Sequence, residues 1–540
     1  MKISVIGSSQ VNLGRISDAG LFSFGKNLSA KSCDLKKNNS IACSLVHNQS
    51  LKWPSKSAVG FTLRSSAAPQ TADIVDFEKA PKTSRTKPVD GMKLFVGLPL
   101  DTVSNSSTIN RARAIAAGLK ALKLLGINGV ELPVWWGIAE KEAMGKYDWT
   151  GYLAVVEMVE KLGLELHVSL CFHASEECRI RLPVWVSQIG EGDPDIYFAD
   201  RSGQQYKDYL SFAVDDVPVL DGKTPVEVYK EFCESFKSAF SPFIGSTITG
   251  ISIGLGPDGE LRYPSHHRCG KFSRGAGEFQ CYDKHMLSNL KLHAEKNGSP
   301  LWGLGGPHDA SSYDQSPLSG GFFAENDGSW ETQYGDFFLS WYSSQLISHG
   351  DRILSLAAST FKDAGITVSG KVPLVHSWHR TLSRPAELTA GFYNTAGRDG
   401  YDDIARIFSR NSCSMILPGM DLTDELQPHE YRSSPESLLA QITSSCRKHG
   451  LKISGQNSLI SGVSGGFAQM KKNLQGEQSS MDRFTYQRMG AHFFSPEHFP
   501  PFAQFVRGVS RPVRRSDEVA VEEGRDDEFL LGSHRHMQTA

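Results

Sequence analysis

Short apolar runs alternate along most of this chain with stretches in which apolar side chains recur every three or four residues. Residues 94–100 form one apolar run, and Ile115, Leu119 and Leu122 then follow at helical spacing. This order predicts a buried strand followed by an amphipathic helix. Gly126 comes after the helical stretch and suits its carboxyl end.

The same strand and helix unit recurs further along. Helices are predicted at 152–162, from the capping box Thr224-Pro225-Val226-Glu227 through Phe232, Phe236 and Phe240, at 337–346, in a second segment capped by Asp351, and at 435–449. Further strands are predicted at 129–136, 164–172, 248–253, 371–375, 414–416, 451–454 and 484–489.

Eight strands separated by helices over about 420 residues fit a (β/α)8 TIM barrel with long loop insertions. A doubly wound parallel sheet is the alternative, because both folds alternate strands and helices. The periodicity leaves this choice open. In the barrel, functional residues gather where the strands end.

Composition narrows the function classes. The 540 residues carry a formal net charge of -2, which argues against a nucleic-acid or anionic membrane surface. No apolar run reaches the roughly 18 residues of a membrane-spanning helix. Nine cysteines are scattered without a C-x-x-C pair, so we expect reduced thiols and no disulfide framework.

The two ends differ from the rest of the chain. Residues 1–70 are rich in serine and carry nine Lys or Arg from Lys2 to Arg64, with only Asp18 and Asp34 as acids. This composition is typical of a transit peptide, and a merely disordered tail on a cytosolic protein is the alternative. We expect a linker at 71–91, the barrel at 92–513 and an acidic flexible tail at 514–540.

One segment, residues 254–265, combines glycines with a carboxylate, Glu260, directly after the strand at 248–253. Its glycines match G-x-G-x-x-G, but a proline and a polar stretch follow, so no helix N-terminus is available for a dinucleotide pyrophosphate. In a purely structural interpretation, Glu260 lies in an exposed turn and forms an ion pair with Arg262. A carboxylate at the end of a strand is also placed for catalysis.

Residues 254–265, together with 277–284, resemble the general-acid segment of the plant β-amylases, the inverting exo-glucanases that release maltose from α-1,4-glucan ends. The order of segments from about 93 to 513 is similar to that family, including the motifs at 135–137, 387–391 and 398–401. The resemblance implies the TIM barrel and, with the N-terminal composition, the chloroplast stroma.

The resemblance fails at the second catalytic position. An inverting glycosidase needs a protonated carboxyl as acid and an ionised carboxylate as base. Glu260 occupies the family's acid position, but the base motif reads Ser454-Gly455-Gln456-Asn457. Gln456 has the shape of glutamate, yet an amide cannot take the proton from water.

Other family positions are altered as well. The family's glycine-rich lid, which brings an essential aspartate, is replaced by the shorter segment 173–183, without the glycines and the Asp. Pro133 replaces an aspartate, Pro418 replaces a threonine, and His266 replaces a tyrosine. A proline removes a hydrogen-bond donor, so neither proline restores a polar contact.

Part of the sugar-binding set is kept. By the resemblance, glucan contacts are expected from His173, Lys371, His376, Asn457 and Arg488. Each of them has an ordinary structural interpretation when taken alone. His266-His267-Arg268-Cys269 lacks a second ligand cluster at suitable spacing, so we expect no metal and no cofactor.

Two functions follow. The first is a catalytically inactive β-amylase homologue that binds glucan weakly, or binds another starch-acting protein, in starch breakdown. The second is an active 1,4-α-glucan maltohydrolase with a different base, for which Asp421 and Asp424 are the nearest candidates in sequence. No nucleic-acid or membrane partner is expected.

Overall fold

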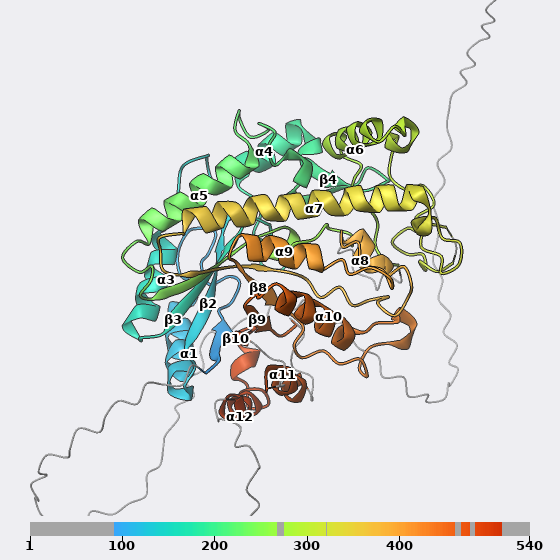
Figure 1. Ribbon diagram of the computed structural model, residues 1–540. Coiled ribbons are helices and arrows are strands. Elements are labelled where there is room, and N and C mark those ends of the chain that lie inside the picture. Colours follow the sequence, from blue (N-terminus) through green and yellow to red (C-terminus); the bar gives the residue numbers. More distant parts are fainter. Residues whose placement is uncertain (1–90, 267–274, 320, 459–465, 476–480, 510–540) are drawn as a thin grey trace, which may run out of the picture. The chain divides into compact units, whose positions relative to one another are not determined.

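A closed barrel of parallel strands forms the centre of the computed structural model, which describes residues 91–266, 275–319, 321–458, 466–475 and 481–509 (Figure 1). Around the barrel the strand order is β1-β10-β9-β8-β7-β6-β3-β2, and β1 pairs with β2 to close it. The barrel strands are β1 (Lys93–Gly97), β2 (Gly129–Trp135), β3 (Glu165–Cys171), β6 (Ile248–Ile253), β7 (Thr367–Lys371), β8 (Ser414–Leu417), β9 (Ile453–Gln456) and β10 (Met481–Tyr486). The TIM-barrel prediction is confirmed, and the doubly wound alternative is excluded.

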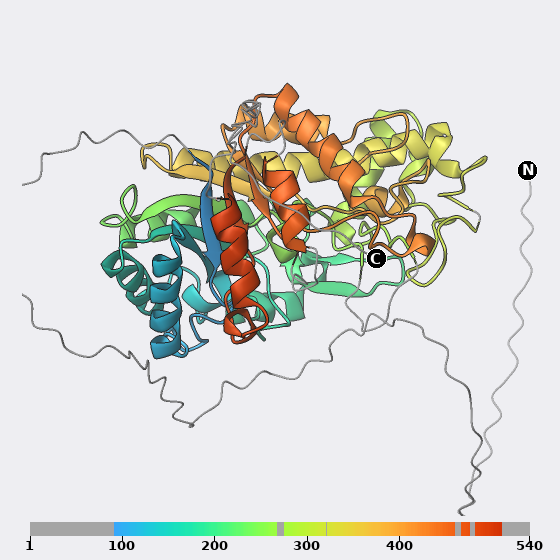
Figure 2. The same ribbon diagram turned by 90° about the horizontal axis from the view of Figure 1, so that it is seen from below.

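The barrel strands are joined by helices and long insertions. The helices are α1 (Ala112–Leu125), α2 (Trp136–Ala139), α3 (Thr150–Lys161), α4 (Val184–Gly192), α5 (Pro225–Ala239), α6 (Lys284–Lys296), α7 (Gln333–Thr360), α8 (Pro385–Thr389), α9 (Asp402–Arg410), α10 (Pro435–Lys448), α11 (Gly466–Gln475) and α12 (Phe499–Val509). An antiparallel hairpin of β4 (Tyr197–Ala199) and β5 (Gln205–Leu210) lies in the insertion after β3. In the view from below, the two red helices α11 and α12 lie side by side (Figure 2).

Local sequence signals explain several of these elements. Gly126 adopts a φ of 92° after α1 and accepts the left-handed conformation that ends the helix. The capping box at the start of α5 is formed, since Thr224 accepts from the Glu227 amide and Glu227 accepts from the Thr224 amide. Phe232 and Phe236 of α5 are fully buried and pack against Trp149.

Three predictions differ clearly from the structure: the two helices near residues 337–351, the strand at 371–375, and the strand at 484–489, which is β10 at Met481–Tyr486. Residues 333–360 form one 28-residue helix, α7, where two helices were expected. A Cβ on Gly350 would lie 2.9 Å from a Leu261 methyl and 3.0 Å from an Ile407 methyl, so this glycine permits close packing and does not end the helix. Asp351 therefore does not cap a helix; it accepts a hydrogen bond of 2.8 Å from Asn411 Nδ2.

The strand predicted at 371–375 ends where it was expected to begin. β7 covers Thr367–Lys371, and its ladder pairs Ser369 with both Ser252 and Ser414. Pro373 lies in the apolar run that follows, and a proline cannot donate to a ladder on its N–H. The segments predicted as a transit peptide (1–70) and an acidic tail (514–540), and nearly all of the predicted linker, lie outside the described residues.

No helix of the described ranges is long and apolar enough to cross a bilayer.

Candidate functional site

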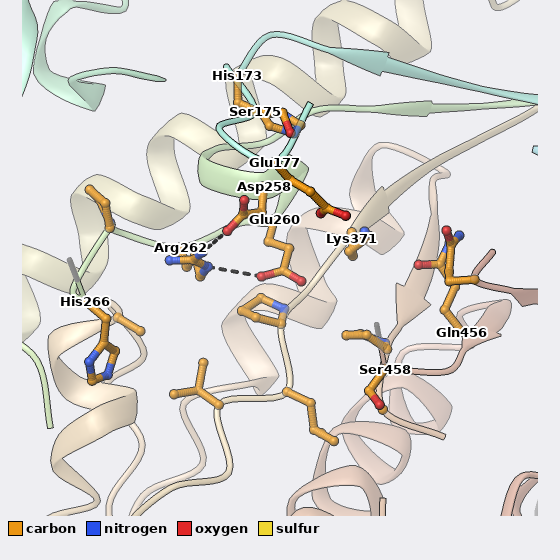
Figure 3. A pocket seen from close by; sticks show the side chains of 18 of the residues that line it. His173, Ser175, Glu177, Asp258, Glu260, Arg262, His266, Lys371, Gln456 and Ser458 are labelled. Carbon is orange, nitrogen blue, oxygen red and sulfur yellow. Dashed lines mark hydrogen bonds and ion pairs between the residues drawn. The ribbon is translucent and has the colours of Figure 1, made fainter. Parts of the chain in front are cut away.

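A cavity of about 500 Å³ lies at the carboxyl ends of the barrel strands (Figure 3). Its lining includes six of the seven residues singled out from the sequence, which come from the ends of five strands or the loops that follow them: Glu260, Gln456, His173, Lys371, Asn457 and Arg488. Glu260 follows β6, Lys371 ends β7 and Gln456 ends β9. Segments that lie up to 315 positions apart in sequence therefore meet at one site, as the strand-end prediction required.

Glu260 is held by the segment that leaves β6. A single 3-10 turn, Pro257–Gly259, separates it from the strand, and Gly259 takes a φ of 76° that favours glycine. The turn is fixed to the neighbouring strand because Leu261 N donates to Lys371 O at 2.9 Å. Glu260 and Lys371 are thus adjacent across a parallel β-bridge.

Arg262 forms ion pairs with both acids of this turn. Its Nε lies 3.0 Å from Glu260 Oε2, and its Nη2 contacts Asp258. Although burial alone lowers the pKa of Arg262, the carboxylates of Asp258 and Glu260 raise it overall. The structure therefore contains the Glu260–Arg262 ion pair that the purely structural interpretation predicted. A proton on Glu260, as an acid requires, would remove this ion pair.

The second catalytic position contacts a carboxylate that the sequence did not point to. Gln456 is 2% exposed, and its Nε2 donates to Glu131 Oε2 at 3.0 Å. Glu131 projects from β2 inside the barrel and is 7% exposed. In the sequence it is one acid within an otherwise apolar strand pattern, which is the signal that could have identified it.

Two more donors approach Glu131. Gln487 Nε2 donates to Oε2 at 2.8 Å, and Ser169 Oγ donates to Oε1 at 2.7 Å. Ser252 Oγ lies 2.8 Å from Ser169 Oγ and donates to it, so a chain of hydroxyls from β6 and β3 ends on this carboxylate. Glu131 thus lies beneath the floor that Gln456 and Gln487 form.

Asn457 connects the ends of two strands. Its Oδ1 accepts from Gln487 N at 2.7 Å, and its Nδ2 donates to Gln487 O at 2.9 Å. These bonds fix the segment after β9 to the segment after β10. Asn457 lines the cavity as predicted, and part of its hydrogen-bonding capacity holds the main chain.

The cationic and aromatic residues complete the lining. Arg488 Nη1 donates to Leu98 O at 2.9 Å, and burial lowers the pKa of Arg488. His173 packs edge-to-face on Trp135, with ring centroids 5.2 Å apart. Lys371 forms no ion pair with any residue that the structure describes.

The short loop at 173–183 brings a carboxylate that the sequence analysis did not point to. It lacks the family's lid aspartate, but Glu177 lines the cavity from this loop (Figure 3). The loop packs tightly on α2, because a Cβ on Gly137 would lie 1.8 Å from Arg181 O. A carboxylate from this loop therefore reaches the cavity.

Two of the three positions that differ from the family lie in the cavity wall, and the third lies in a barrel strand. Pro418 and His266 line the cavity. Pro133 lies in β2 and pairs in register with Ser169 of β3. The residues 267–269 that follow His266 lie outside the described residues. No three His, Cys, Asp or Glu side chains converge as metal ligands within the described ranges.

The two aspartates proposed as replacement bases do not line the cavity. Asp421 accepts two hydrogen bonds from Ser458, from its N and its Oγ, both at 2.6 Å. Asp424 accepts from Ser434 Oγ at 2.7 Å and from Arg380 at 2.9 Å. Although burial raises the pKa of Asp424, these hydrogen bonds lower it overall. Both carboxylates serve local structure.

His376 is the one predicted glucan contact that the cavity lining does not include. Burial lowers its pKa to about 4, so the ring is neutral near pH 7. Its main chain holds the neighbouring loop, since Ser434 N donates to His376 O at 3.2 Å.

Comparison with known proteins gives consistent matches. The sequence profile of glycosyl hydrolase family 14 matches residues 95–512. "Inactive beta-amylase 9" of Arabidopsis thaliana is 57% identical over 530 residues, which are 97% of this chain and 96% of that protein. "Beta-amylase 1, chloroplastic" of Oryza sativa subsp. japonica is 41% identical over 432 residues, which are 78% of this chain and 81% of that protein.

A second relative with an inactive name and a solved structure also match. "Inactive beta-amylase 4, chloroplastic" of Arabidopsis thaliana is 38% identical over 436 residues, which are 77% of this chain and 82% of that protein. The catalytic domain of a β-amylase from Paenibacillus polymyxa superposes with a TM-score of 0.64 at 24% identity, covering 78% of this chain and 99% of that one. The last match shows the same barrel fold.

Proposed function

The chain belongs to glycosyl hydrolase family 14, the β-amylases, and we propose that it is a catalytically inactive member that acts in starch breakdown as a regulatory, glucan-binding protein. The observation that carries this proposal is Gln456, an amide at the base position of a cavity that keeps Glu260. Figure 3 shows Glu260 and Gln456 with Lys371 between them.

The chemistry supports inactivity. Water must lose a proton to a base as it attacks the sugar, and an amide cannot take that proton at physiological pH. A missing general base typically costs about 10²–10⁴-fold in rate. Pro133 and Pro418 remove further polar contacts, because neither side chain carries a donor or an acceptor. The name of the relative at 57% identity agrees with this proposal.

Sugar binding does not need a base. Aromatic packing and hydrogen bonds recognise a sugar in either an active or an inactive site, and the cavity offers Trp135, Lys371 and Arg488. With the family's lid and strand aspartates absent, we expect high-micromolar or weaker affinity for maltodextrin, on the order of -5 kcal/mol.

Titration calorimetry with maltodextrin tests this binding. Wild type should give a signal that Lys371→Ala and Arg488→Ala reduce, while substitution of an exposed residue far from the cavity, such as Leu124→Ala, should leave it unchanged. If wild type gives no signal at millimolar sugar, the proposal survives only as binding of another starch-acting protein.

We further propose that the protein acts in the chloroplast stroma. Support comes from the transit-peptide composition of residues 1–70 and from relatives that are named chloroplastic. A fluorescent fusion of the full chain should enter plastids, and a fusion without residues 2–70 should stay in the cytosol. Cytosolic fluorescence from the full chain would refute this location.

One observation favours the alternative, an active maltohydrolase. Glu177 lines the cavity, and no described residue forms an ion pair with it. A carboxylate in this position is a candidate base that the sequence did not suggest. Substitution of Glu177 therefore belongs in any activity assay of this protein.

A further inference from the structure

Glu131 and Gln456 form a hydrogen-bonded pair. The carboxylate sets the orientation of the amide, and the amide avoids a second negative charge beside the carboxylate. The carboxylate can only accept hydrogen bonds when ionised, so the side of the Gln456 amide that faces it must be the NH2 group. The Gln456 carbonyl oxygen is then turned away from Glu131, toward the cavity that Gln456 lines. The amide of Gln487 is ordered in the same way, by its own bond to Glu131.

We propose that Glu131 is a positioning residue that turns the Gln456 carbonyl into a fixed acceptor for a ligand hydroxyl and excludes a carboxylate from position 456. The first half rests on the proposed glucan ligand. The second half does not, because it follows from the contact between the two side chains alone.

The exclusion follows from like charge. A glutamate at 456 would place an oxygen where Nε2 now lies, 3.0 Å from Glu131 Oε2. Two carboxylates that share a site cannot both ionise freely, so one would retain a proton to a higher pH. The titratable groups that face Glu131 are Arg483 and Arg488 from the β10 side and the Cys171 thiol from β3. Neither arginine forms an ion pair with Glu131 among the described residues.

The test compares melting temperatures across pH for wild type, Gln456→Glu, and the charge-swapped double variant Glu131→Gln/Gln456→Glu. In the single variant the folded state holds an extra proton. Its stability should therefore match wild type at about pH 5 and fall below it as pH rises toward 8. The double variant again pairs one amide with one carboxylate, so its pH dependence should return to that of wild type. Equal pH dependence of the single variant and wild type would overturn the proposal.

Ligand binding tests the orientation. Glu131→Gln keeps the size of the side chain but removes the fixed acceptor, so the Gln456 amide is free to turn over. Maltodextrin affinity should fall about 5- to 10-fold by calorimetry, as expected for a lost hydrogen bond to a neutral acceptor. Unchanged affinity in Glu131→Gln would refute the positioning role. Failure of wild type to bind would refute the glucan ligand, whereas the melting comparison decides the charge exclusion.

Discussion

Gln456→Glu restores a second carboxylate to the cavity, but we expect it to restore no useful maltose release. The reason lies in Glu131, whose Oε2 is 3.0 Å from the atom that the substitution makes an oxygen. Two unit charges about 4 Å apart repel by about 4 kcal/mol at an effective dielectric constant of 20.

The repulsion favours a proton shared between the two carboxyl groups, and this hydrogen bond turns the group at 456 toward Glu131 and away from the cavity. A restored general base raises the rate by at most about 10²–10⁴-fold. A carboxyl group that is turned toward Glu131 raises it by less. Pro133 and Pro418 stay in place, and losses in a cooperating site do not simply add.

Maltose release from soluble starch is measured for wild type, Gln456→Glu and Glu131→Gln/Gln456→Glu between about pH 5 and pH 8. The double variant is the control, because it carries the same carboxylate at 456 without the neighbouring charge. Any activity present only in the double variant measures the effect of Glu131. Release of maltose with inversion by the single variant, at rates near those of an active β-amylase, would show that neither Glu131 nor the two prolines prevents catalysis.

Three predictions concern the scaffold around the cavity. His349 is fully buried, contacts the buried carboxylate of Asp215 through Nδ1 at 2.8 Å and donates from Nε2 to Leu255 O at 3.0 Å, so His349→Ala should lower the free energy of unfolding by about 3–5 kcal/mol in urea. Burial raises the pKa of Asp283 to about 7, so the stability that its proton gives is lost between about pH 4 and pH 7. The free energy of unfolding of Asp283→Asn in urea, relative to that of wild type, should therefore be higher at pH 8 than at pH 5. Gly137→Ala should cost about 1–3 kcal/mol in the same assay, because the new Cβ displaces Arg181 O.

Each of these predictions has an outcome that contradicts it. A cost below about 1 kcal/mol for His349→Ala would show that the buried bond to Leu255 is replaced or unimportant. Parallel stability curves for Asp283→Asn and wild type would show that Asp283 is ionised in the folded protein throughout this range. An unchanged unfolding free energy for Gly137→Ala would show that the loop moves aside without cost.

Most of the barrel strands were predictable because they are short apolar runs followed by a helical pattern, but the choice of a barrel over a doubly wound sheet came from the resemblance to the β-amylases. The site was predictable in the same way, since Glu260, Lys371 and Gln456 all sit where a strand ends. The strand at 371–375 was misplaced because its apolar run lies just beyond the barrel, whereas β7 itself contains Ser369 and Gly370. Hydrophobicity alone favours the wrong segment there.

The contacts that decide the chemistry were not predictable. Glu131 and Gln456 are separated by 325 positions, and no local pattern links a glutamate in β2 to an amide at the end of β9. Glu177 was missed for a related reason: the altered loop has no aspartate, and only the folded path of the chain brings a glutamate to the cavity. Both contacts depend on the folded path of the chain, and spacing along the sequence does not predict them.

Inactivity is tested most directly by maltose release from soluble starch at high protein concentration, with Glu260→Ala and Glu177→Gln assayed in parallel. We predict that wild type stays at the background level and that neither substitution changes it. Wild-type release of maltose that Glu260→Ala abolishes would contradict the account. Loss of that release in Glu177→Gln as well would show that an active protein depends on the Glu177 carboxylate.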